Sequence, residues 1–142
     1  MCTKNDLIEY AKKKQVDATF TGFLPYEQMC GLLCSCDFTV NPILGSSVAS
    51  IINKHGDYAA CGLAVINTQN SKEYCQLVEE YKMGLNSVQK GAQDLADKIL
   101  LLANDEELRK EMGKNARRCA EERFNRINTY PKIVKLIKGL LN

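Results

Sequence analysis

The chain has 142 residues, 45% of them apolar and 25% charged, and a domain of this size can bury roughly 70% of its unfolded surface. Its net charge of +2 is too small for a nucleic-acid-binding protein, which needs a strong basic patch. The longest aliphatic run, 99–103, is far too short to cross a membrane, and residues 1–10 do not resemble a secretory signal. We therefore expect one soluble, cytoplasmic globular domain over residues 1–142.

Seven cysteines are spread along the chain, an odd number that cannot form a full set of disulfides. Most lie in apolar or helical segments, where a thiol behaves as a small hydrophobic group. The cluster Cys30, Cys34 and Cys36 has no Cys-x-x-Cys pair, and the one histidine is far away in the sequence. We therefore predict free thiols in a reducing cytoplasm and no metal site.

Helices and strands are predicted to alternate from the start of the chain. Thr3 and Asp6 have nearly the spacing and chemistry of a capping box at the start of a first helix. Residues 18–23 are rich in β-branched and aromatic side chains, which predicts a strand. Pro25 then suits the first turn of a second helix, which should run to about residue 35.

The same alternation continues to about residue 88. Residues 37–42 predict a second strand, and a loop of small residues leads into a helix over about 51–61. The apolar segment 63–68 predicts a third strand, and 83–88 predict a fourth, with a helix capped by Ser71 between them. Such an order with short connections predicts an α/β fold, in which helices cover the faces of a parallel sheet.

The remaining residues are predicted to be helical. Asn104 with Glu107 indicates where one of these helices begins, and a last helix should cover about 126–141. The segment 123–142 is basic and amphipathic, with five basic residues and no acidic one. Two interpretations of it stay open: it docks on protein, or it contacts an anionic membrane as a peripheral helix.

The loop after the second strand is the first candidate binding site. Ligands of open parallel sheets bind beyond the carboxyl ends of the strands, and the small residues Gly45, Ser46 and Ser47 would let a ligand approach the backbone there. The first N–H groups of the following helix have no internal partner and attract anions such as phosphate. Lys54 and Asp57 are neighbours on that helix, and could bind a phosphate and two sugar hydroxyls. The pattern therefore favours a nucleotide.

Each of these residues also has a structural interpretation. Lys54 and Asp57 could form a surface ion pair, worth under about 1 kcal/mol. His55 is predicted to pack against the core rather than act as a general base. Glu73 either lies near a bound sugar or complements the dipole of the helix that begins at Ser71.

Four segments, FTGFLPYEQM, CDFTVNPI, NKHGDYAACGLAVINT and MGLN, resemble in order and spacing the C-terminal, donor-binding half of family 4 glycosyltransferases. The resemblance covers residue 17 to about 110. It implies one Rossmann-like, three-layer half of the GT-B architecture, a retaining reaction and a nucleotide-diphosphate sugar as donor. It implies no cofactor and no catalytic metal.

The resemblance also assigns residues of the donor site. It implies that Asp57 holds the donor's ribose and that the turn Gly22–Pro25 borders the base, with backbone groups of Phe23 and Leu24 bonding to it. Lys54 is similar to a lysine found in bacterial polysaccharide branches of the family. Ala49 stands where many members have a glutamate near the transferred sugar. Catalytic residues are not assigned.

Family donor domains begin with a strand that comes before the helix predicted at residues 4–14. We expect that this strand and the acceptor-binding N-terminal domain are not part of the sequence. We therefore expect a fragment of a glycosyltransferase that transfers a hexosyl group to a polysaccharide or lipid-linked acceptor. Alone it should bind nucleotide weakly and transfer nothing. The alternatives are a non-catalytic nucleotide-binding or regulatory module, and a sugar-nucleotide epimerase of the same architecture.

Overall fold

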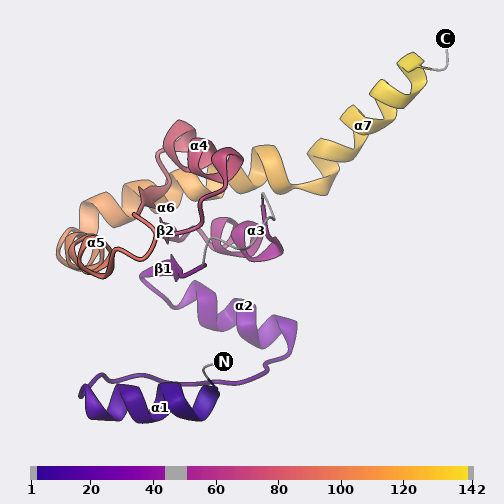
Figure 1. Cartoon of the computed structure of the whole chain (residues 1–142). Coiled ribbons are helices and arrows are strands. Elements are labelled where there is room, and N and C mark those ends of the chain that lie inside the picture. The colour runs from indigo at the N-terminus through magenta and orange to yellow at the C-terminus, as the bar shows by residue number, and fades with distance from the viewer. Residues whose placement is uncertain (1–2, 44–50, 141–142) are drawn as a thin grey trace.

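The computed structural model describes residues 3–43 and 51–140 (Figure 1). Its elements are α1 (Lys4–Lys13), α2 (Tyr26–Cys34), β1 (Phe38–Asn41), α3 (Asn53–Ala60), β2 (Ala64–Asn67), α4 (Lys72–Tyr81), β3 (Gly84–Asn86), α5 (Ala92–Asn104), α6 (Glu106–Cys119), the π-helical turn η1 (Ala120–Phe124) and α7 (Arg126–Leu140). The predicted alternation of helices and strands is therefore present from α2 to α5.

The sheet is parallel and has the order β1-β2-β3. Val65 of the central strand pairs with Thr39 on one side and with Gly84 on the other. All four residues of β2 are buried, as expected for a strand covered on both faces. The predicted α/β fold with a parallel sheet is confirmed.

The prediction of a strand over residues 18–23 is wrong. This segment has no regular secondary structure, and most of its residues are exposed. A strand is stabilised by hydrogen bonds and side-chain packing with a neighbouring strand. The three-stranded sheet of the described residues does not include residues 18–23. Without a neighbouring strand to pair with, their high β-propensity is not enough to form a strand.

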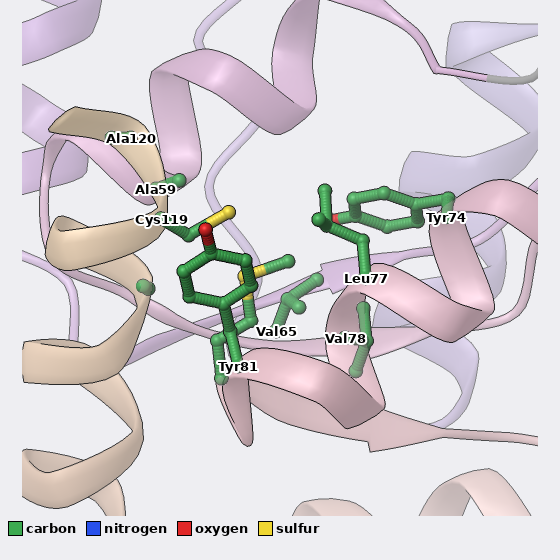
Figure 2. Close-up of a cluster of buried hydrophobic side chains, with 10 residues drawn as sticks. Ala59, Val65, Tyr74, Leu77, Val78, Tyr81, Cys119 and Ala120 are labelled. Atoms are coloured by element: carbon green, nitrogen blue, oxygen red, sulfur yellow. The ribbon is translucent and has the colours of Figure 1, made fainter. Parts of the chain in front are cut away.

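Buried side chains form two clusters, one on each face of the sheet. Since side chains alternate along a strand, Val65 belongs to one cluster, and Ala64 and Ile66 belong to the other. Figure 2 shows the first cluster, in which Val65 lies among side chains from α3, α4 and the end of α6. The second cluster joins the sheet to α5 and α6. Helices on both faces thus produce the three layers.

Short-range signals set several helix starts. Thr3 and Asp6 form the predicted capping box, and Ser71 Oγ accepts a hydrogen bond from Tyr74 N at 3.3 Å. The start of α6 differs from the prediction, because Asp105, not Asn104, caps it by accepting from Leu108 N at 2.9 Å. A carboxylate suits this position, since the positive end of the helix dipole attracts it.

The backbone of β3 approaches Val65 of β2 closely at Gly84. A Cβ atom at this position would overlap the carbonyl oxygen of Val65 and would lie 2.7 Å from Val65 Cγ1. Val65 is almost completely buried in the central strand. The close pairing of these two strands therefore requires a residue without a side chain at position 84.

The chain leaves the three-layer body after η1. Asn125 has an extended backbone, with φ −70° and ψ 115°, and α7 then extends away from the body (Figure 1). The helix has no buried residue. Its exposed apolar side chains are Ile127, Tyr130, Ile133, Val134, Leu136, Ile137 and Leu140. Within residues 3–43 and 51–140, no helix has both the length and the apolar character to cross a membrane.

Candidate functional site

Asp57 and Tyr26 join two helices that flank β1. The Tyr26 hydroxyl, at the first position of α2, donates a hydrogen bond to Asp57 Oδ1 at 3.0 Å. Helix α2 leads into the amino end of β1, whereas α3, which carries Asp57, follows the carboxyl end. The start of α2 and the first turns of α3 therefore meet beyond the carboxyl end of β1, where ligands of parallel sheets bind.

A groove of about 810 Å³ opens beside this pair. Its walls are the start of α2, one side of α3 along its whole length, the end of α6 with η1, and the first residue of α7. Asp57 and Glu121 bring negative charge to it, and Arg117 and Arg126 bring positive charge. The volume is in the range of sites for small ligands, which are roughly 300–1,000 Å³.

Two of these charged residues, Arg117 and Glu121, form an ion pair with each other. Arg117 Nε donates to Glu121 Oε1 at 2.8 Å, and its guanidinium also donates to the carbonyl of Ala60 at 2.6 Å. Arg126, in contrast, forms no ion pair with any residue of the described ranges. The groove therefore offers an unpaired cation together with the Asp57 carboxylate.

The hydrogen bond to Asp57 raises the pKa of Tyr26 to about 12, with a smaller contribution from Cys30. The phenol therefore stays protonated at neutral pH and acts as the donor. A carboxylate can accept several hydrogen bonds at its two oxygens. With Oδ1 bonded to Tyr26, Asp57 can still accept from a ligand hydroxyl group.

Lys54 and Glu73, the other charged residues predicted for the site, do not line the groove. Lys54 is exposed and forms no ion pair with Asp57, so the surface-pair interpretation is wrong. Glu73 lies in the first turn of α4 and accepts from Ser71 Oγ at 3.1 Å. Gly45, Ser46 and Ser47 lie outside the described residues, so their predicted role stays a prediction.

The predicted base-binding turn lies directly before Tyr26. Gly22 has a φ of +69°, which suits glycine, and Leu24 is partly buried. The Phe23 side chain is 96% exposed. The turn therefore exposes an aromatic ring a few residues before Tyr26, but none of its four residues lines the groove itself.

A largely buried polar network, which was not predicted from the sequence, lies at the ends of the three strands. Asn41, Asn67 and Asn86 each end a strand and occupy paired positions of the sheet. Asn41 Nδ2 donates to Asn67 Oδ1 at 3.1 Å, and Asn67 Nδ2 donates to Asn86 Oδ1 at 3.0 Å. Three apolar segments that each end in asparagine were the signal in the sequence, but only the register shows that the three residues meet.

His55 of α3 extends this network. The ring is 0% exposed, which confirms the prediction that it packs in the core. Its Nε2 lies 2.7 Å from Asn41 Nδ2. Since Asn67 Oδ1 accepts from Gln69 N at 3.0 Å, Asn41 must present its NH₂ group to Asn67, and the second hydrogen of that group is then directed at Nε2. Ile52 N also lies 3.4 Å from Nδ1, but the contact at Nε2 is much shorter, at 2.7 Å. The shorter contact makes Nε2 the acceptor of a neutral imidazole.

The His55 ring also stacks on Tyr74 of α4. The two ring centroids are 3.4 Å apart and the planes differ by 3°. Because burial disfavours the cation, the pKa of His55 is lowered to about 4. The ring is therefore neutral at physiological pH.

The cysteines near the groove are free thiols. Cys61 Sγ lies 4.0 Å from the carbonyl oxygen of Cys30. Burial, followed by a hydrogen bond with Cys34, raises the pKa of Cys61 to about 12. In the part of the chain that the structure describes, no three His, Cys, Asp or Glu side chains are arranged to hold a metal ion.

The parallel sheet between helices and the groove beyond β1 define an α/β domain consistent with a Rossmann-like half of the GT-B architecture. The family model described as "Glycosyl transferases group 1" matches residues 3–119, and the chain belongs to this family. Membership supports a glycosyltransferase-type function, which involves a sugar donor and an acceptor. No curated protein and no solved structure matches the chain significantly.

Proposed function

We propose that this chain is the nucleotide-sugar-binding domain of a retaining glycosyltransferase of the bacterial polysaccharide-biosynthesis type. In the complete enzyme it would help transfer a hexosyl group to a polysaccharide or lipid-linked acceptor. The observation that carries this proposal is the position of Asp57: its carboxylate lines the groove one turn into α3 and is fixed there by the Tyr26 hydroxyl.

The groove has the chemical groups that a nucleotide diphosphate needs. The second oxygen of Asp57 can accept from the ribose hydroxyls, and the positive end of the α3 dipole favours the diphosphate. Arg126 adds a cation to the lining of the groove. Such groups stabilise the negative charge that develops on a leaving nucleotide diphosphate, which makes catalysis electrostatic and positional.

Replacing Asp57 with alanine is expected to weaken the binding of UDP or GDP about tenfold, because a hydrogen bond to a charged group contributes roughly 1.5–3 kcal/mol. Isothermal titration calorimetry of the chain measures this. Asp97→Ala is the matched control, since it removes an exposed carboxylate from α5, away from the groove, and its affinity should equal that of the wild type. Equal affinities for Asp57→Ala and the wild type would contradict the proposal.

We also propose that α7 contacts an anionic membrane surface. It has exposed apolar residues, and its charged side chains are all basic.

The chain should sediment with phosphatidylglycerol vesicles but not with phosphatidylcholine vesicles, and high salt should release it. Ile137→Glu should abolish the binding, whereas Gly139→Glu, about 200° further around the helix, should retain much of it. Failure to bind either vesicle would favour docking of α7 on protein.

A further inference from the structure

We infer that His55 is a positioning residue of the groove: through Asn41 it fixes α3, and therefore Asp57, against the ends of the three strands. This inference rests on the proposed function, since it concerns the same groove. It assigns to a buried, neutral histidine a role in ligand binding that it performs without touching the ligand.

The positions of His55 and Asp57 on one short helix provide the first step. Both lie in α3, and their side chains point about 200° apart around the helix axis. His55 is completely buried toward the sheet, while Asp57 lines the groove. Because α3 is a short regular helix, any rotation that displaces the His55 ring displaces the Asp57 carboxylate as well.

The partners of His55 provide the second step. Asn41 connects the ring to β1, and the Asn67–Asn86 contacts extend the connection to β2 and β3. Asn86 Nδ2 in turn donates to the Cys75 carbonyl of α4 at 3.1 Å. The network therefore connects α3 to every strand of the sheet and to the next helix.

Tyr74 limits the same motion from another direction. Its ring lies parallel to that of His55 at 3.4 Å, and it is 1% exposed. Turning α3 about its axis would break the stacking as well as the hydrogen bond to Asn41. The two contacts are independent of each other, and together they allow one orientation of the helix.

The polar character of these contacts is the third step. Apolar side chains of similar size would fill the space without the need to satisfy buried donors and acceptors. A fully bonded polar network instead specifies one arrangement of its members, because hydrogen bonds have a direction. Polar residues therefore stand at the positions that fix the geometry of the groove.

Variants of His55 separate the hydrogen bond from the packing. His55→Phe keeps a ring beside Tyr74 but cannot accept from Asn41, and UDP affinity should fall about tenfold, as expected when a binding group is misplaced. His55→Gln can accept from Asn41 and should restore most of the affinity. Leu102→Ala, in the cluster on the other face of the sheet, is a control that lowers stability and should leave affinity unchanged.

Hydrogen exchange without nucleotide is the second measurement. In His55→Phe, amides of residues 57–61 should exchange faster than in the wild type, while those of α5 stay unchanged. If the wild-type chain binds neither UDP nor GDP, the proposed function fails, but hydrogen exchange still tests the role of His55. Unchanged exchange at residues 57–61 in His55→Phe would overturn the inference. A Gln variant that exchanges and binds like the Phe variant would also overturn it.

Discussion

Replacing Gly84 with alanine is expected to lower the free energy of unfolding by about 3 kcal/mol or more, enough to unfold much of a marginally stable chain. The added Cβ would overlap the carbonyl oxygen of Val65 and lie 2.9 Å from its carbonyl carbon. Neither strand can move away cheaply, because Val65 N donates to Met83 O at 3.3 Å and its side chain belongs to a buried cluster. Urea denaturation followed by circular dichroism measures the change.

Gly31→Ala is the matched control for this substitution. Gly31 is exposed in α2, and no described atom lies within 4 Å of the position of an added Cβ. Alanine in a helix interior is favoured over glycine by roughly 0.5–1 kcal/mol, so stability should rise slightly. If Gly84→Ala were as stable as Gly31→Ala, β2 and β3 would not approach as closely as described.

Stability is expected to increase by about 3 kcal/mol between pH 4 and pH 6.5 because of His55. Burial lowers its pKa in the folded chain to about 4, from an ordinary value of 6.5. Between these values the unfolded chain binds a proton at this position and the folded chain does not. Acidification therefore favours unfolding through this range, and the His55 contribution is fully present above pH 6.5.

His55 is the one histidine of the chain, so the effect can be assigned to it. Asp94, whose pKa is lowered to about 2 by its hydrogen bond with Lys98, adds a pH dependence that lies below its ordinary value of 3.8. Unfolding in urea at several values above pH 5 isolates the histidine. His55→Gln should lose the dependence there, whereas an equal slope in both proteins would contradict the assignment.

The elements that depend on short-range signals could be predicted from the sequence. The capping box of Thr3 and Asp6, the Ser71 cap and the apolar segment before Asn67 each act within a few residues, so their predictions were confirmed. Residues 18–23 have a local signal for a strand that is equally strong, but they do not form one. A strand also needs a partner from elsewhere in the chain, and local composition does not contain that information.

The candidate site shows the same difference between local signals, which the sequence reveals, and contacts between distant residues, which it does not. Residue type, helical position and resemblance to a family led to the prediction that Asp57 binds the donor. The structure places Asp57 in the groove, and its binding role stays a prediction. Its bond with Tyr26 spans 31 positions and depends on how α2 lies against α3. The role of His55 depends on register, since Asn41 and Asn67 become neighbours through the pairing of two strands. No local pattern predicts these distances.

The extended residue Asn125 has a practical consequence. The described residues after it, 126–140, form α7, which has no buried residue and contacts η1 through bonds such as that from Asn128 Nδ2 to the Glu121 carbonyl. Truncation tolerance depends on the burial of the removed segment. Limited trypsin digestion after Arg126 would thus leave both hydrophobic clusters intact, and the shortened product would keep the melting behaviour of the whole chain.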